Sequence, residues 1–227
     1  MDTVSTDAVE RRAPEQSFET ARPLPPIRRP KLAWHNFAAM GRFLWMRARY
    51  RQVKGGLFYR GKGCWFEFGP DAEFEVGAHT RFLGRFTCSV TGKVKIGPGC
   101  HFSRDTQLSC MDSITIGRNS GFAEGVAIHD MTHCFGPEWA HDSFWDKPFW
   151  TAPISIGDNV WVGCKATIIA GVTIGDDVVI AANSVVNKDI PSHCVVAGVP
   201  ARVIRSWADE AEATAPGRQR VPTGDRA

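Results

Sequence analysis

The chain has 227 residues, which is long enough for one repetitive domain with extensions. Its 27 Lys and Arg residues nearly balance its 24 Asp and Glu residues, and this near-neutral charge gives no support for binding to nucleic acid. The seven cysteines are scattered and odd in number, which argues against a closed disulfide framework. A reducing, cytoplasmic location is the simplest expectation.

Residues 1–30 are predicted to form a flexible tail, because they hold many charged residues and prolines but few large apolar side chains. The charges in this segment are not followed by the apolar core of a secretory signal. The chain also lacks an apolar run of the length that crosses a membrane. We therefore expect the folded part to begin after this tail.

Residues 31–54 are predicted to form a helix with a broad apolar side that includes Trp34, Leu44 and Trp45. All charged residues of this segment are basic. Two interpretations are open. The first, which we favour, is a helix that covers the open first turn of the following domain. The second is peripheral contact of residues 31–53 with an anionic membrane surface.

Residues 55–92 alternate between apolar and polar side chains, which predicts strands. Within and beyond this segment, large apolar residues begin to recur at every sixth position. Val76 and Phe82 begin this spacing, and after an interruption it resumes at Ile96, Phe102 and Leu108 and then at Ile116, Phe122 and Ile128. Between Leu108 and Ile116 the spacing exceeds six by two residues, which predicts a bulged corner.

The period of six is most regular in residues 153–205. The aliphatic positions there are Ile156, Val162, Ile168, Ile174, Ile180 and Val186. A period of six fits neither a helix nor an open strand, so it predicts short strands stacked between turns, as in a parallel β-helix with coils of about 18 residues. Small residues such as Ala166 are expected to turn the corners, and glycines such as Gly157 to tolerate backbone geometry that a Cβ would hinder.

Residues 129–152 interrupt this array and carry three His, three Asp, three Phe and three Trp. A long insertion of this composition is typical of a functional site. Its tryptophans, Trp139, Trp145 and Trp150, are predicted to form one wall of an acceptor pocket or to pack the insertion onto the coils.

Residues 153–205 read PISIGDNVWVGCKATIIAGVTIGDDVVIAANSVVNKDIPSHCVVAGVPARVIR. This stretch resembles the sugar, capsule and xenobiotic acetyltransferase branch of the hexapeptide-repeat acyltransferases, and with the weaker upstream repeats the resemblance covers about residues 76–205. It implies a mainly β fold, a left-handed parallel β-helix over residues 55–205 with an N-terminal helix and a long active-site loop at residues 129–152. It also implies acetyl-coenzyme A as the acyl donor and a homotrimer. Residues 206–227 are assigned to a C-terminal tail.

The chemistry of acetyl transfer to an alcohol requires a base. The hydroxyl proton has to leave as the oxygen attacks, and imidazole, with a reference pKa of ~6.5, suits this near neutral pH. On sequence chemistry alone, His133 is one of three histidines in the insertion. In the resembling family the catalytic histidine lies at the mouth of this loop, and its spacing from Ile116 is kept, so the resemblance implies that His133 is the general base at a subunit interface.

The resemblance also implies the contacts to the two substrates. The residues expected to bind acetyl-coenzyme A are Cys164, Ala182, Asn187, Lys188, Arg202 and Arg205. Small residues would let the pantetheine arm lie along the coil edge, and the cations would bind phosphates. The residues expected near the acceptor are Ser103, Asp105, Asp130 and Trp139. Of these, Trp139 is expected from its planar ring, and Asp130, together with His129, is also expected to orient the loop. Ser103 stands where sugar-acetylating relatives often carry Asn, which argues against a simple galactoside-like acceptor.

The favoured function is an acetyl-coenzyme A-dependent O-acetyltransferase acting on a sugar, a surface glycan or a glycosylated small molecule. One alternative is an N-acetyltransferase for amino sugars, antibiotics or other xenobiotics. A zinc enzyme like the γ-class carbonic anhydrases fits poorly, because after His129 and His133 no histidine recurs on the following hexads until His193, and no metal site is predicted. A non-catalytic trimeric scaffold is the last alternative.

Overall fold

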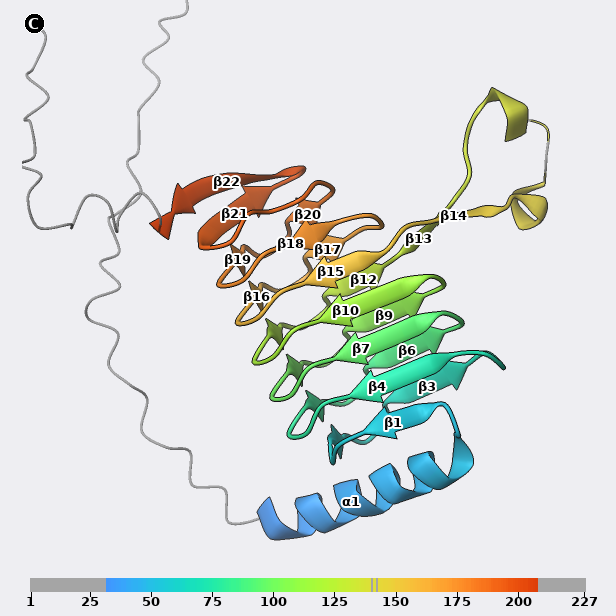
Figure 1. The fold of residues 1–227 in the computed structure, drawn as a ribbon, viewed down its shortest axis with the longest axis vertical. Coiled ribbons are helices and arrows are strands. Elements are labelled where there is room, and N and C mark those ends of the chain that lie inside the picture. The colour runs from blue at the N-terminus through green and yellow to red at the C-terminus, as the bar shows by residue number, and fades with distance from the viewer. Residues whose placement is uncertain (1–31, 140, 142, 208–227) are drawn as a thin grey trace, which may run out of the picture.

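The computed structural model of the chain describes residues 32–139, 141 and 143–207. The predicted tail at residues 1–30 lies outside these ranges, as does the predicted C-terminal tail from residue 208 onward. The described residues form one helix, α1 (Leu32–Arg49), followed by a tall stack of short strands (Figure 1).

The strands stack into three sheets, one for each face of a coil (Figure 1). Sheet A contains β1 (Val53–Gly55), β4 (Glu73–Val76), β7 (Lys93–Ile96), β10 (Ser113–Ile116), β15 (Ile154–Ile156) and β18 (Thr173–Ile174). Sheet B contains β2 (Tyr59–Arg60), β5 (Arg81–Phe82), β8 (His101–Phe102), β11 (Gly121–Phe122), β16 (Trp161–Val162), β19 (Val179–Ile180), β21 (Cys194–Gly198) and β22 (Ala201–Ser206). Sheet C contains β3 (Trp65–Phe68), β6 (Thr87–Val90), β9 (Gln107–Cys110), β12 (Ala127–His129), β17 (Thr167–Ile168) and β20 (Val185–Val186). The predicted β-solenoid is therefore confirmed.

The upstream coils are longer than three hexads. Phe74 pairs with Val94 and Val94 with Ile114, so each of these coils takes 20 residues, whereas the downstream coil from Ile156 to Ile174 takes 18. The predicted bulged corner after Leu108 is wrong. In its place the four-residue strands β9 and β10 are joined by a two-residue turn, and the extra residues lengthen the strands.

Helix α1 covers the first coil. Phe43 and Met46 are buried, and the Phe43 ring packs edge-on against Phe58 at 4.9 Å between centroids. The helix ends at Arg49 and not at residue 54 as predicted, because Val53 already pairs with Phe74 in sheet A and needs extended backbone. Within the described residues, no helix is long and apolar enough to cross a membrane.

The residues that turn the chain at the corners are not the small residues that the sequence predicted. The residues that turn the chain have positive φ, for example 55° at Asn159 and 57° at Lys165, and each stands one position before a buried residue, Val160 or Ala166. The small residue, Ala166 in the second case, is fully buried and fills the inside of the corner. Gly157 is required by close approach, because a Cβ there would lie 2.8 Å from the backbone of Gly175 in the next coil.

The core of the upstream coils is a column of phenyl rings. Phe102 stacks between Phe82, at 5.0 Å, and Phe122, at 4.6 Å between ring centroids. Downstream, Val162 and Ile180 continue the same buried column. Along sheet B, rings occupy the longer coils and aliphatic side chains the shorter ones, as expected if core volume follows coil length.

We predict that Phe102→Ala lowers the free energy of unfolding by about 3–5 kcal/mol, because it leaves a cavity between two stacked rings. Phe102→Leu keeps most of the volume and should cost less than about 1.5 kcal/mol. Urea denaturation followed by circular dichroism measures both values. Equal losses for the two variants would contradict a close-packed column.

Candidate active site

The insertion forms a projecting arm, residues 130–152. It contains two short strands, β13 (Met131–His133) and β14 (Phe149–Thr151), which pair antiparallel, and two 3-10 turns, η2 (Pro137–Trp139) and η3 (Phe144–Asp146). The arm leaves the stack after β12 and extends away from the coils (Figure 1). The insertion occurs where the sequence predicted a long loop, and the hairpin of β13 and β14 is an addition to that prediction.

The base of the arm is held by Asp130. Its side chain is fully buried, and its two carboxylate oxygens accept hydrogen bonds from the backbone N–H groups of Met111, at 2.8 Å, and Asp112, at 2.9 Å. The backbone N–H of Ala152 donates to the Asp130 carbonyl at 3.0 Å. Both ends of the arm are therefore tied to one another and to the corner of the preceding coil.

His133 lies on β13 at the start of the arm. Its imidazole packs against the rings of Phe149, at 4.2 Å, and Phe144, at 4.4 Å between centroids. The Nδ1 atom is buried and has no hydrogen-bond partner among the described residues. The Nε2 atom is then the nitrogen that remains available to a reacting group.

The rings beside His133 are not the predicted ones. Phe149 faces His133 directly in the β13–β14 pairing, while Trp145 and Trp150 are 87% and 51% exposed. Trp139 lies in η2, where its carbonyl accepts a hydrogen bond from Lys147 Nζ at 2.9 Å. Recognition of the hairpin would have identified Phe149, because cross-strand pairs bring side chains into contact.

His129 is the second imidazole at this edge. It ends β12 and pairs with Ser109 on sheet C. Burial lowers the pKa of His129, and the nearby Asp130 carboxylate acts in the opposite direction with a smaller effect, so the neutral form is favoured. Within the part of the chain that the structure describes, no three His, Cys, Asp or Glu side chains are grouped to hold a metal ion.

The other predicted site residues lie along both edges of sheet C. Ser103, Asp105, Cys164 and Ala182 lie on the corners between sheets B and C. Asn187 and Lys188 follow β20 at the opposite edge, the one from which the arm departs. One chain therefore does not bring His133 together with Ser103 and Asp105.

The predicted donor contacts are accessible. Cys164, Ala182, Asn187 and Lys188 have exposed side chains at the ends of their strands. Gly163, beside Cys164, lies so close to the next coil that a Cβ would come within 2.5 Å of the Ala182 backbone nitrogen. Arg202 and Arg205 lie on β22, which closes sheet B, and both side chains are exposed.

Asp105 is engaged in an ion pair with Arg85 on the corner of the preceding coil. The hydrogen bond from Arg85 is the main cause that lowers the pKa of Asp105. Both side chains are exposed, so the pair contributes little to stability. It leaves Asp105 ionised and oriented along the coil edge.

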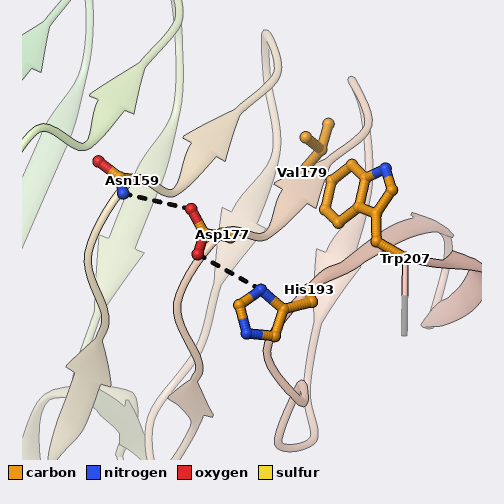
Figure 2. Close-up of a pocket in the computed structure, with 5 residues that line it drawn as sticks. All are labelled: Asn159, Asp177, Val179, His193 and Trp207. Atoms are coloured by element: carbon orange, nitrogen blue, oxygen red, sulfur yellow. Dashed lines mark hydrogen bonds and ion pairs between the residues drawn. The ribbon is translucent and has the colours of Figure 1, made fainter. Parts of the chain in front are cut away.

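A separate cavity of about 350 Å³ lies on the corners between sheets A and B. Asn159, Asp177 and His193 stack along one side, with hydrogen bonds or ion pairs of 3.2 Å and 3.3 Å between neighbours, and Val179 and Trp207 complete the lining (Figure 2). None of the predicted site residues lines this cavity. It is therefore distinct from the edge that carries His133.

Comparison with solved structures agrees with the solenoid fold. A mutant of AntD, an N-acyltransferase from Bacillus cereus solved with dTDP and coenzyme A, superposes with a TM-score of 0.60 over 75% of this chain and 93% of that chain. The two sequences are 20% identical, so the likeness concerns the fold.

Comparison with known sequences identifies the family. A profile for the bacterial transferase hexapeptide, with six repeats, matches residues 153–188. Galactoside O-acetyltransferase of Escherichia coli K12 is 34% identical over 164 residues, which cover 66% of this chain and 79% of that protein. A putative lipopolysaccharide biosynthesis O-acetyl transferase of the same organism is 30% identical over 70% of this chain and 81% of its own length. With its stacked coils and its histidine-bearing arm, the chain belongs to the hexapeptide-repeat acyltransferase family.

Proposed function

We propose that this protein is an acetyl-coenzyme A-dependent O-acetyltransferase that acts on a hydroxyl group of a sugar, a surface glycan or a glycosylated small molecule. The observation that carries the proposal is His133, a histidine held between two phenyl rings at the base of the arm with Nε2 available. The two similar proteins from Escherichia coli are named as O-acetyltransferases, which supports a hydroxyl acceptor.

In the proposed reaction His133 acts as the general base. Its Nε2 atom takes the proton of the acceptor hydroxyl while the oxygen attacks the thioester carbonyl of acetyl-coenzyme A. The resulting tetrahedral intermediate collapses with cleavage of the carbon–sulfur bond. The imidazolium of His133 then returns the proton to the leaving thiolate, so that the products are the acetyl ester and free coenzyme A.

The donor is proposed to lie along sheet C and its corners. Cys164 and Ala182 are small and exposed, which leaves room for the pantetheine arm beside the strands. Lys188 and Arg202 offer exposed cations for the phosphates of coenzyme A. The proposed location is the cytoplasm, where a reducing environment would keep the exposed thiol of Cys164 unpaired.

Asp130 is proposed as a positioning residue. Its carboxylate binds two backbone N–H groups and is fully buried, so it is suited to fix the arm and not to contact the acceptor. Ser103 and Asp105 remain the proposed acceptor contacts, with Trp139 on the arm.

A homotrimer is proposed because the site needs groups that one chain holds apart. His133 lies on one edge of sheet C, whereas Ser103 and Asp105 lie on the other. The arm also exposes large aromatic surface, including Trp145 and Trp150, that a neighbouring subunit would cover.

We predict that His133→Ala lowers kcat by about 10²–10⁴-fold, the usual contribution of a general base, while the Kd for coenzyme A stays the same. Release of free thiol from acetyl-coenzyme A is measured with a panel of sugars, glycolipid precursors, amino sugars and antibiotics. His141→Ala removes an exposed histidine of the same arm and serves as the control.

The panel separates the alternatives. Turnover that persists in His133→Ala would show that another group is the base. Turnover restricted to amino acceptors would replace O-acetylation by N-acetylation, and a wild-type protein that neither turns over nor binds coenzyme A would favour a scaffold.

We predict that Asp130→Asn lowers the free energy of unfolding by about 1–3 kcal/mol, because an amide nitrogen would face a backbone N–H donor. Hydrogen exchange should become faster in residues 131–151, and kcat should fall with little change in the KM for acetyl-coenzyme A. Asp146→Asn, an exposed acid of the same arm, is the matched control. Unchanged exchange in the arm would refute the positioning role.

We predict that light scattering coupled to gel filtration gives a mass of three chains of 25.0 kDa each. Trp145→Gln combined with Trp150→Gln should shift the mass toward the monomer, because it removes apolar contact surface from the arm. Trp45→Gln, on α1 and away from the arm, should leave the mass unchanged. A monomeric wild-type protein would exclude a site shared between subunits.

A further inference from the structure

Helix α1 has two different faces. Its inner face packs on the first coil through Phe43 and Met46, which are 5% and 1% exposed. One and two positions along the chain from Phe43, Leu44 and Trp45 are 57% and 56% exposed. Since neighbouring residues on a helix are about 100° apart, Leu44 points away from the coils. The Trp45 ring stays more than half exposed, although its edge meets Tyr50 at 6.4 Å and the Arg60 guanidinium of the first coil lies over it at 5.9 Å. The capping role of the helix therefore leaves its outer apolar stripe uncovered.

Cations flank this stripe. Arg47 and Arg49 are exposed on its two sides, and Ala48 lies between them on the outer face. Arg47 donates one hydrogen bond to the Gly55 carbonyl of β1 at 3.2 Å, which ties it to the first coil, and Arg49 lies over the Tyr50 ring at 5.3 Å. Both side chains stay exposed. The sequence of α1 contains no acidic residue.

The first coil and the turn that leads to it also expose large apolar side chains and basic residues. Leu57 and Trp65 are 47% and 66% exposed, and Arg51, Lys54 and Lys62 are exposed cations nearby in the chain. Exposed acids occur at four positions of the first two coils. They are Glu67, Asp71, Glu73 and Glu75. Glu73 is paired with Lys93 at 3.1 Å, and Glu75 stands opposite Lys54 in the pairing of β1 with β4, so these two acids face cations of the coils. Helix α1 itself carries basic residues and no acid.

We infer that the outer face of α1, formed by Leu44, Trp45, Arg47, Ala48 and Arg49, docks on an anionic lipid bilayer. The indole and the leucine would enter the interfacial region, and the arginines would contact lipid phosphates. The helix lies across the end of the stack, so docking leaves the arm free (Figure 1).

Charge selects the bilayer over a second copy of the chain. A symmetric contact between two such faces would bring Arg47 and Arg49 of each copy against the same residues of the other, with no acid on the helix to separate them. An anionic lipid surface has the opposite charge at high density. Lipid binding requires no acyl transfer, and only its benefit for a membrane-anchored glycan acceptor rests on the proposed function.

The test is flotation of the full-length protein with two kinds of vesicle, one of phosphatidylcholine and one of phosphatidylcholine and phosphatidylglycerol in equal parts. The wild-type protein should float with the anionic vesicles and release at high salt. Leu44→Gln with Trp45→Gln should lower the partition coefficient by about tenfold or more. Arg47→Gln with Arg49→Gln should lower it by about fivefold for each arginine at low salt.

Two control variants match these changes. Arg81→Gln with Arg104→Gln removes the same charge from exposed positions of later coils, and Val203→Thr with Ile204→Thr removes exposed apolar groups from β22 at the other end of the stack. Neither should change vesicle binding. Thermal unfolding of each variant confirms that it is folded.

Two results would overturn the inference. The first is a wild-type protein that does not float with anionic vesicles, or variants on α1 that float as the wild type does. The second is a change of mass in light scattering for Leu44→Gln with Trp45→Gln without a change in flotation, which would assign this face to a protein contact. Thiol release with soluble acceptors, measured in parallel, reports on the proposed activity independently.

Discussion

Parallel hydrogen bonding between successive coils is the constraint on which this structure depends. Each strand is too short to be stable alone, so each coil has to return the chain in register with the previous one. Residues with positive φ at the corners, such as Asn159, and glycines at points of close approach, such as Gly157, serve this requirement. The arm is compatible with it because Ile114 pairs directly with Ile154, so the ladder continues as if the insertion were absent.

The repeated features of the fold were predictable because they occur many times in the sequence. Inward positions such as Ile156 and Val162 are at most 1% exposed, as the period of six indicates. The features that were missed occur once or vary between coils. The three-residue strands of the arm are too short for an alternating pattern to be recognised. The longer strands β9 and β10 add two residues to the spacing after Leu108, and this excess looks like a bulge when every strand is assumed to have the same length.

The candidate site was predictable to a smaller extent, since sequence reports residue types and not their partners. Asp130 was expected near the acceptor, but its neighbours in space are the backbone N–H groups of Met111 and Asp112, about twenty positions earlier. Phe149 was overlooked because only the hairpin brings it to His133. The role of His133 still comes from the family resemblance, and the structure adds the packing that orients its ring.

The solenoid also fixes the distance between helix α1, the proposed membrane contact, and the arm that carries His133. In sheet C, three strand spacings separate β3 of the first coil from β12, after which the arm begins. At about 4.8 Å for each spacing, the start of the arm lies roughly 15 Å along the stack from the coil that α1 covers. With α1 docked on a bilayer, a lipid headgroup alone would be too short to reach this height. An acceptor carried on a glycan chain, with a reactive hydroxyl several sugar units from its lipid, would reach it, so the rigid stack favours extended surface glycans among the proposed acceptors.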